Sequence, residues 1–435
     1  MRVLFATHAE PTHFHGMVPL AWALQNAGHE VRVASQPALT GVVTSAGLTA
    51  VPLGTDHRLH EVLRRTGRLA EADPLPFDFA RPAEEITWPW LEAGYRAFVP
   101  WWLRLVNDGL IAELTAFCLD WRPDLVLWEP LTHAGAVAAQ ACGAVHGRVL
   151  WGLDLFGRMR AHFLRLRPPG APDPLADWLT ARGAVFEEAL VTGQFTIDHT
   201  PPSLRTGTCD LPGLDHLPVR WVPCGGAAAV PDWLRERPRL PRVCLTLGTS
   251  GFAPTDRRGG LAELLTALAC PEVELVATVP PSAVPPGLPN VRAVPFTPLD
   301  ALLPSCAVVV HHGGHGTYRT ALLHGVPQLV LANVFDLGLR ARHLAAEGAG
   351  LTASSAPEVA AAAHRLRTEP RFRLHAARLR AEALTLPSPC DLVPELELRA
   401  AVGRNHHAHP VRVLRRENPL PDTGAPGLGT PERRP

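Results

Sequence analysis

The chain has 435 residues, 46% of them apolar, which is enough for two globular domains with separate cores. Basic and acidic residues number 41 each, so no net charge recruits nucleic acid or an anionic membrane surface. The eight cysteines form no C-x-x-C pair, and no apolar run reaches the 18 or so residues of a membrane span. These features favour a cytoplasmic enzyme with reduced thiols over a secreted, membrane or cysteine-zinc protein.

The first half of the chain alternates short apolar runs with helical segments. A strand is expected over residues 2–8, then a loop over 9–16 and an amphipathic helix over 17–29, with Gly28 placed to end it. Further strands are expected over residues 30–35, 48–54, 123–130 and 147–154. This alternation predicts an α/β fold with a doubly wound parallel sheet.

A second series of apolar runs follows a segment rich in Pro, Gly and Arg, residues 223–241, which we interpret as an interdomain linker. Strands are expected over residues 242–250, 272–280, 290–296, 306–312 and 328–334. The predicted domains are therefore 1–222 and 242–400. The tail, 401–435, has no apolar periodicity and is expected to be disordered.

The stretch CAVVVHHGGHGTYRTALLHG, residues 306–325, combines three features of an anion site. Ala307–Val310 has the β-branched composition of a buried parallel strand, and Thr317–His324 reads as a helix that ends at Gly325. The glycines between them allow a sharp turn and close approach of a ligand. The free N–H groups of the helix start would then face an anion. A tight connection without a ligand is the alternative.

This stretch, together with VPLAWALQNAGHEVRVAS, WRPDLVLWEPLT and HGVPQLVL, resembles family 1 glycosyltransferases. The resemblance is closest to actinomycete enzymes of the erythromycin desosaminyltransferase type, which attach deoxysugars to macrolides and related polyketides. It extends to about residue 400. It implies two Rossmann-like domains that face each other across a cleft (GT-B), with a C-terminal helix that returns toward the N-terminal domain.

The resemblance implies a donor site in the second half of the chain. His312 would contact the donor diphosphate. His311, one residue earlier, would have a structural role, and His315 could have either of these two roles. The other implied diphosphate ligands are Gly314, Gly316, Thr317, Thr249 and Ser250. Phe296 and Thr320 would contact the nucleoside, and Asp336 and Leu337 the sugar.

Two of these positions bear on the identity of the donor. Many uridine-using relatives carry Glu eight residues after the diphosphate histidine, where it bonds both ribose hydroxyls, and this chain has Thr320 there. The shorter side chain is compatible with a deoxyribose, so we expect dTDP as the carrier. Many relatives carry Gln where this chain has Leu337, and an apolar side chain suits a sugar that lacks a hydroxyl.

The resemblance also places a general base in the loop after the first strand. His13 matches the base of inverting members, and His8 and His15 are rivals nearby. A carboxylate of the N-terminal half would normally orient such a histidine. The candidates are Asp124, Glu129 and Asp154, which the sequence alone does not rank. No D-x-D triplet occurs in the chain, so we expect no metal requirement and no cofactor.

Aromatic residues concentrate in residues 86–109, where Trp88, Trp90 and Trp101 are candidates for an acceptor pocket. Core packing or a protein interface would explain the same density. Some relatives act only with a cytochrome-like auxiliary protein that has lost its haem, and this segment could bind such a partner. A homodimer is a further expectation.

These features together predict an inverting glycosyltransferase that moves a deoxysugar from a dTDP-sugar to a hydroxyl of a hydrophobic polyketide or macrolide aglycone. Two alternatives stay open at this point. Sugar-nucleotide epimerases share the fold but need no aromatic acceptor region. A non-catalytic binding partner would need neither His13 nor His312.

Overall fold

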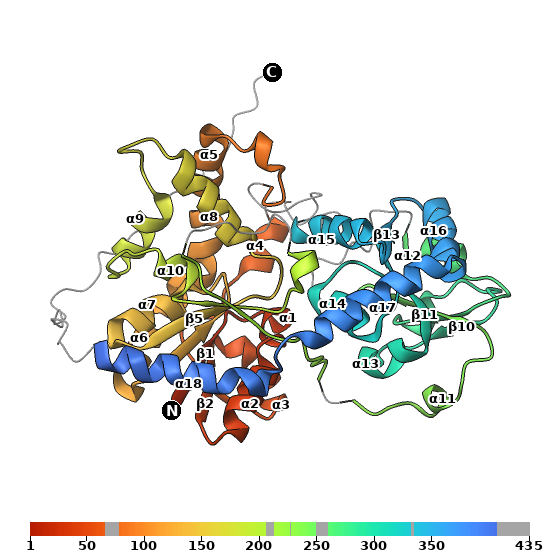
Figure 1. The fold of residues 1–435 in the computed structure, drawn as a ribbon, viewed down its shortest axis with the longest axis horizontal. Helices are drawn as coiled ribbons and strands as arrows, with labels where there is room; N and C mark the ends of the chain where they lie inside the picture. The colour runs from red at the N-terminus through yellow and green to blue at the C-terminus, as the bar shows by residue number, and fades with distance from the viewer. Residues whose placement is uncertain (66–77, 206–212, 227, 249–259, 332–334, 407–435) are drawn as a thin grey trace.

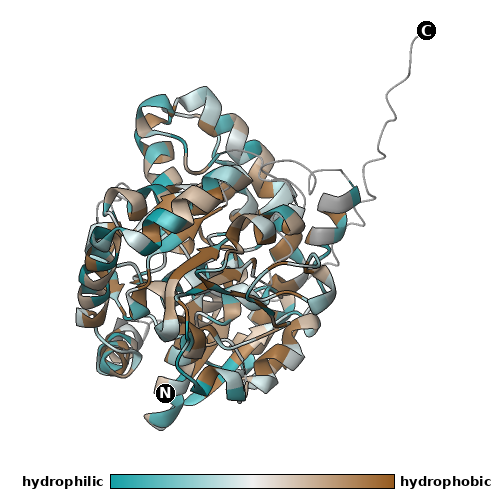
Figure 2. Cartoon of the chain, turned by 90° about the vertical axis from the view of Figure 1, so that its right-hand side faces the viewer, coloured by the Kyte–Doolittle hydropathy of each residue, from teal (hydrophilic) through white to brown (hydrophobic). Residues whose placement is uncertain are grey.

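The computed structural model describes residues 1–65, 78–205, 213–226, 228–248, 260–331 and 335–406. These residues form two α/β domains side by side, each built around a parallel sheet (Figure 1). Figure 2 shows apolar strands inside and helices of mixed hydropathy around them. The predicted fold class, two Rossmann-like domains of the GT-B type, is confirmed.

The N-terminal domain contains a seven-stranded sheet in the order β3-β2-β1-β4-β5-β6-β7. Its strands are β1 (Arg2–Ala6), β2 (Glu30–Ser35), β3 (Thr49–Pro52), β4 (Leu125–Trp128), β5 (Val145–Val149), β6 (Thr196–Asp198) and β7 (His216–Pro218). β1 is an interior strand, with Phe5 paired to Val33 of β2 on one side and to Leu127 of β4 on the other. The strand expected over 147–154 ends at Val149, and the residues after it form a loop. β6 and β7 were not predicted.

Helices cover both faces of this sheet. They are α1 (Pro11–Phe14), α2 (Val18–Asn26), α3 (Thr40–Ser45), α4 (Leu59–Arg65), α5 (Trp88–Phe98), α6 (Arg104–Trp121), α7 (His133–Cys142), α8 (Leu155–Leu166), α9 (Pro174–Ala181) and α10 (Ala189–Thr192). Short turns are η1 (Pro37–Leu39), η3 (Ala83–Glu85), the π-helical η4 (Val99–Leu103) and η5 (Pro202–Leu204).

The expected loop over residues 9–16 contains the short helix α1, so that prediction was wrong in part. Pro11 occupies the first turn, and the Glu10 carboxylate caps it by accepting a hydrogen bond from the Thr12 N–H. α2 follows and is shorter than expected, with Gly28 in the left-handed region at φ +86° after it. His13 is thus carried on a capped turn.

The C-terminal domain contains a six-stranded parallel sheet in the order β10-β9-β8-β11-β12-β13. Its strands are β8 (Arg242–Thr246), β9 (Glu274–Ala277), β10 (Val291–Ala293), β11 (Cys306–His311), β12 (Gln328–Val330) and β13 (Gly350–Thr352). Its helices and turns are α12 (Gly260–Leu268), η6 (Pro281–Ala283), α13 (Leu299–Leu302), η7 (Leu303–Ser305), α14 (His315–His324), α15 (Phe335–Ala346), α16 (Ala356–Thr368) and α17 (Pro370–Thr385). The segment between the domains carries one short helix, α11 (Asp232–Arg235).

The last helix, α18 (Pro389–His406), crosses back to the N-terminal domain (Figure 1). Leu392, Leu396 and Ala400 are buried in the same core cluster as β1 and α2. A Cβ at Gly403 would lie 2.0 Å from Cγ2 of Val145, so the packed face continues past Ala400. The expectation of a disordered tail from residue 401 was therefore wrong for its first six residues, which extend α18 to His406. Residues from 407 lie outside the described ranges.

Among the helices that the structure describes, none has the length and hydropathy of a membrane span. The seven cysteines within the described ranges are all free thiols.

Candidate active site between the two domains

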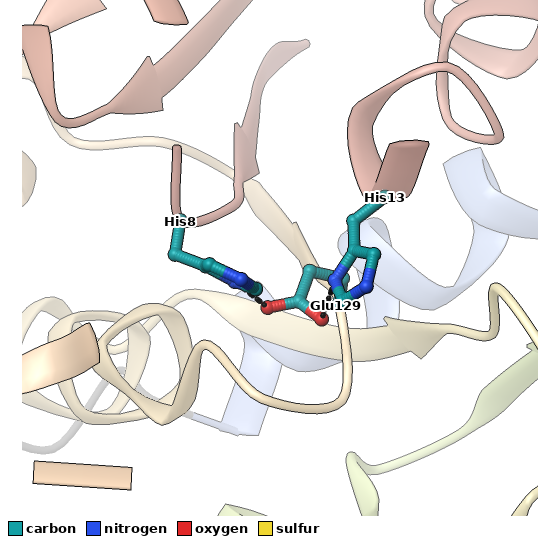
Figure 3. Close-up of side chains that lie close together, drawn as sticks. All are labelled: His8, His13 and Glu129. Carbon is teal, nitrogen blue, oxygen red and sulfur yellow. Dashed lines mark hydrogen bonds and ion pairs between the residues drawn. The ribbon is translucent and has the colours of Figure 1, made fainter. Parts of the chain in front are cut away.

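The loops after β1 and β4 meet at the carboxyl edge of the N-terminal sheet. The two strands are neighbours, with Ala6 paired to Trp128, so the residues that follow each strand emerge side by side. His8 and His13 follow β1, and Glu129 directly follows β4. Figure 3 shows the two imidazoles on either side of the Glu129 carboxylate.

Glu129 accepts a hydrogen bond from each histidine. Nδ1 of His13 lies 3.3 Å from Oε2, and Nδ1 of His8 lies 2.9 Å from Oε1. An ionised carboxylate only accepts hydrogen bonds, so each Nδ1 carries a proton. A neutral His13 therefore has its free lone pair on Nε2, which is the position a general base needs.

Three other groups hold the Glu129 carboxylate. The Leu131 N–H donates to Oε2 over 3.1 Å, the Thr132 hydroxyl donates to Oε1, and Nε1 of Trp151 donates to Oε2 over 3.0 Å. Burial by itself would raise the pKa of Glu129. The charge of His8 and the hydrogen bonds from both histidines outweigh burial and hold that pKa well below its usual range. Glu129 is ionised at neutral pH.

The structure distinguishes His13 from its rivals. The His13 side chain keeps 14% of its surface exposed, whereas His8 keeps 3% and lies behind the carboxylate. The two rings meet edge to face at 4.9 Å. His15 directly follows α1, where its ring contacts that of Phe14 and burial lowers its pKa. His13 is thus the histidine that is both bonded to Glu129 and open to a substrate.

The two other carboxylate candidates lie elsewhere. Asp124 accepts a hydrogen bond from the Arg2 N–H at the start of β1, the opposite edge of the sheet. Asp154 caps α8 through the Gly157 N–H and forms a buried ion pair with Arg148. Both carboxylates are thus bound to partners other than His13.

The same cluster has ligand atoms at a spacing that an ion could bridge. One atom each of His8, His13 and Glu129 lies within 4.8 Å of the other two. The two contacts have hydrogen-bond lengths, and Glu129 accepts from three further donors, so protons account for the arrangement. The expectation of metal independence stays a prediction.

The donor side is the turn from β11 into α14. Gly313 adopts φ +96°, which favours glycine, and Gly314 caps the helix. α14 begins at His315, two residues earlier than expected, and ends at Gly325 in the left-handed conformation. Gly316 is exposed in the first turn, and Thr317 is buried behind it. The amide groups of this turn point away from the helix, as anion binding requires.

His312 lies between two glycines. A Cβ at Gly248 would lie 2.2 Å from its Cε1, and a Cβ at Gly314 would lie 2.4 Å from its Nε2. Its Nδ1 is buried without a hydrogen-bond partner among the described residues. Burial, with a contribution from the charge of Arg340, lowers the pKa of His312 to about 4. The side chain is therefore a neutral imidazole that can donate one hydrogen bond.

His311 faces the other side of the strand end. Its Nδ1 accepts from the Gly313 N–H at 3.0 Å, so its Nε2 donates to Oε1 of Gln328 at 2.9 Å. Both ring nitrogens thereby hold the glycine turn against β12. His315 instead faces the domain boundary, with Nδ1 3.5 Å from Nη1 of Arg340 and its ring 5.1 Å from that of Trp221.

Thr320 lies one turn into α14, next to Trp221 of the N-terminal domain. Its hydroxyl donates to the Gly316 carbonyl at 2.7 Å and accepts from Nε1 of Trp221 at 3.4 Å. Phe296, the other expected nucleoside contact, is 54% exposed. Thr249 and Ser250 lie outside the described residues.

Asp336 opens α15 and is buried. Its carboxylate pairs with Arg340 one turn later, over two contacts of 2.9 Å, and accepts from the Leu153 N–H at 3.3 Å. Leu337 lies close to the glycine turn, because a Cβ at Gly313 would be 3.3 Å from its Cβ. The expected sugar contacts thus lie where the C-terminal domain meets the loop after β5.

Comparisons with known proteins identify the family. Residues 22–248 match "Erythromycin biosynthesis protein CIII-like, N-terminal domain", and residues 262–398 match the C-terminal domain of the same family. The chain belongs to the erythromycin biosynthesis protein CIII-like family. It is a glycosyltransferase of the GT-B fold.

Several relatives of this glycosyltransferase are similar over almost their whole length. A 10-deoxymethynolide desosaminyltransferase of Streptomyces venezuelae is 48% identical, covering 93% of this chain and 98% of the relative. An erythronolide mycarosyltransferase of Saccharopolyspora erythraea is 44% identical, covering 91% and 98%. Among solved structures, the glycosyltransferase VinC in complex with dTDP has a TM-score of 0.80 at 38% identity, covering 92% of this chain and 100% of that one.

The tryptophans expected to line an acceptor pocket differ in their surroundings. Trp88 and Trp90 lie in α5 and are half-buried: Trp88 packs 5.1 Å from Phe163, and Arg81 stacks 5.2 Å over Trp90. Trp101, in η4, is 42% exposed. The ring that lies against the His13 imidazole in this glycosyltransferase is Trp151, at 4.2 Å and 19°.

Sequence reasoning missed three residues of this site: Trp151, Arg340 and Trp221. Trp151 fell inside the strand expected over residues 147–154, and Trp221 follows β7, which was not predicted, so the sequence placed neither residue at a carboxyl edge. Arg340 had a weak signal, since it lies four residues after Asp336 and an i, i+4 pair meets on a helix.

Proposed function

We propose that this glycosyltransferase moves a deoxysugar from a dTDP-sugar to a hydroxyl of a hydrophobic polyketide or macrolide aglycone, with inversion at the anomeric carbon. The relatives named above act on such aglycones according to their names, and VinC was solved with dTDP. The observation that carries the proposal is the pairing of His13 with Glu129 on one domain, opposite the glycine turn at α14 on the other.

His13 acts as the general base. Glu129 holds Nδ1–H, so Nε2 accepts the proton of the acceptor hydroxyl as its oxygen attacks the anomeric carbon. The bond from that carbon to the diphosphate breaks on the opposite face, and dTDP leaves. Glu129 stabilises the imidazolium that forms. General-base assistance of this kind contributes about 10²–10⁴-fold to the rate.

The α14 turn stabilises the leaving group. Negative charge grows on the diphosphate as the sugar departs, and the amides of Gly314 and Gly316 with the Thr317 hydroxyl donate to it. His312 adds a hydrogen bond as a neutral imidazole, because burial keeps it unprotonated. Arg340 supplies positive charge nearby, partly balanced by Asp336. Phosphate ligands Thr249 and Ser250 remain part of this proposal.

The donor's sugar and nucleoside are read by the remaining residues. Asp336 accepts hydrogen bonds from sugar hydroxyls, and the apolar Leu337 faces the position where a deoxysugar lacks one. Phe296, which is exposed, packs on the thymine. Thr320, shielded by Trp221, leaves no carboxylate for a ribose 2′-hydroxyl. This arrangement favours dTDP over UDP.

The acceptor is a hydrophobic aglycone bound on the N-terminal side. Trp151 lies beside His13, and Phe156 follows at 6.3 Å, in ring contact with Phe98 of α5 at 5.9 Å. These rings lead from the base toward the helix that carries Trp88 and Trp90. The exposed Trp101 is the residue there that a cytochrome-like auxiliary protein or a second copy would cover. We place the reaction in the cytoplasm, where free thiols persist.

A donor and acceptor panel tests the proposal. Desosamine, mycarose and 2-deoxyfucose, each as the dTDP-sugar, would be offered with 10-deoxymethynolide, erythronolide B and aklavinone, and products identified by mass. An aglycone mass increased by one sugar residue supports transfer. Conversion of the dTDP-sugar to an isomer without change in any aglycone would support the epimerase, and release of no nucleotide would support a binding protein.

A further inference from the structure

Trp151 contacts both members of the proposed base pair. Its indole stacks on the His13 imidazole, with ring centroids 4.2 Å apart and planes inclined by 19°. Its Nε1–H donates to Oε2 of Glu129 over 3.0 Å, the same oxygen that faces Nδ1 of His13. One side chain thus touches the ring of the base and the carboxylate that orients it.

The position of Trp151 is fixed by its own segment. Leu150 is held in the sheet by a hydrogen bond from its N–H to the Ile197 carbonyl. Asp154 caps α8 and forms a buried ion pair with Arg148, over 2.6 and 3.0 Å. Trp151 therefore projects from a short loop that is anchored at both ends.

The next two residues of this loop reach the C-terminal domain. The Leu153 N–H donates to Oδ2 of Asp336 at 3.3 Å. A Cβ at Gly152 would lie 2.5 Å from the same oxygen, so only glycine leaves room for the carboxylate there. The loop that holds the base is thereby in contact with the residue expected to bind the donor sugar.

We propose that Trp151 is a positioning residue that fixes the plane of the His13 imidazole and directs its Nε2 toward the acceptor hydroxyl. This inference rests on the proposed function of His13 as the base. A hydrogen bond to Nδ1 alone leaves the imidazole free to tilt about the N–H···O axis. The indole face removes that freedom on one side, and its N–H keeps Oε2 in line with Nδ1.

The neighbours of His13 bear on the test. The titratable groups that face it are Glu129 from the loop after β4, His8 from the loop after β1 and His315 from α14, whose pKa is lowered by burial and then by the charges of Arg319 and Arg340. His8 meets the His13 ring edge to face, whereas the Trp151 indole is stacked on it. Removing the indole therefore changes the orientation of His13 without removing its hydrogen-bond partner.

Three variants separate the two contacts. Trp151→Phe keeps the stacking and loses the N–H, and we expect kcat to fall about tenfold, as for loss of a hydrogen bond to a charged group. Trp151→Leu loses both contacts, and its kcat should fall further. The KM for the dTDP-sugar should stay within about twofold in both. Trp22→Phe is the matched control, since Trp22 is exposed and its Nε1 donates only to the Ala46 carbonyl.

Double variants test whether Trp151 acts through the base. In a His13→Ala background, Trp151→Phe should lower kcat no further, because the group it positions is gone. If the fold-losses in kcat of the two single variants multiply in the double variant, the proposal is overturned. Wild-type kcat in Trp151→Phe and Trp151→Leu would overturn it too. A wild-type enzyme that transfers no sugar in the panel would instead contradict the proposed function.

A measurement that needs no turnover distinguishes a failure of this inference from a failure of the proposed function. The Hε1 resonance of His13, assigned by its loss in His13→Ala, should be displaced by the ring current of the stacked indole. It should shift downfield in Trp151→Leu and change little in Trp22→Phe. An unchanged resonance in Trp151→Leu would show that the indole does not hold the imidazole, whatever the enzyme's activity.

Discussion

Glu129 receives hydrogen bonds from His8, His13, Leu131, Thr132 and Trp151, more than an orienting carboxylate needs for one histidine. A buried, ionised carboxylate is costly unless each oxygen is satisfied. The surplus donors therefore keep Glu129 charged in a closed site. The charge is then available to His13 when it takes a proton.

Replacement of this carboxylate tests its role. Glu129→Gln keeps the shape and removes the charge, so the imidazolium of His13 loses its counter-ion and its tautomer is no longer enforced. We expect turnover to fall by about 10²-fold or more, with dTDP affinity unchanged. Asp124→Asn is the control, because Asp124 lies at the opposite edge of the sheet, and it should keep wild-type turnover. Equal losses of turnover in Glu129→Gln and Asp124→Asn would indicate damage to the fold and would contradict a specific role of Glu129.

Metal removal gives a second prediction at this scale. Dialysis against EDTA should leave turnover unchanged, since protons account for the contacts among His8, His13 and Glu129. Added Zn²⁺ should inhibit reversibly, because the three ligand atoms lie within 4.8 Å and a bound ion would block the base. Loss of activity in EDTA that Mg²⁺ restores would contradict this account.

The β11–turn–α14 unit shows which parts of a site a sequence can predict. Its strand, glycines and helix are contiguous, so the local pattern of residues 306–325 was sufficient, and the helix start differed by only two residues. The pairing of His13 with Glu129 spans 116 residues and depends on β1 lying beside β4. Sequence spacing could list three carboxylates but could not choose among them.

The glycine beside His312 provides a prediction for this unit. Gly248 has φ +74°, and a Cβ there would lie 2.2 Å from the His312 ring, so Gly248→Ala must strain the backbone and displace the imidazole. We expect dTDP binding to weaken about tenfold or more, measured by calorimetry. Gly41→Ala on α3, where a Cβ would meet nothing within 4 Å, should bind dTDP normally. Wild-type affinity in Gly248→Ala would exclude His312 from the donor site.

At the scale of the whole molecule, the two domains are joined by more than the linker. α18 completes the N-terminal core, Asp336 contacts the loop after β5, and Trp221 lies over α14. None of these contacts follows from a local pattern. The sequence pattern predicted two sheets and the family resemblance implied a returning helix, while the residues at the domain boundary became visible only in three dimensions.

Buried histidines make the stability of the molecule depend on pH. Burial lowers the pKa to about 4 in His133, His146 and His312 and to about 3 in His199 and His311. In the unfolded chain, each of these histidines binds a proton with a pKa near 6.5. Stability is therefore complete above pH 6.5 and is lost as the pH falls toward the folded values.

Between pH 6.5 and its folded pKa, each of these histidines lowers the free energy of unfolding by about 1.4 kcal/mol per pH unit. We expect the urea midpoint to fall clearly between pH 7.5 and 5.5. The same midpoint at both values would show that these side chains are protonated without unfolding.

The central claim is that His13 is the base, and the His13→Ala variant tests it most directly. The measurement is turnover in a direct product assay, with dTDP affinity determined on the same preparation. The account predicts a loss of turnover of at least about 10²-fold with dTDP affinity nearly unchanged. Wild-type turnover by His13→Ala would contradict it and would leave His8 or His15 as the base.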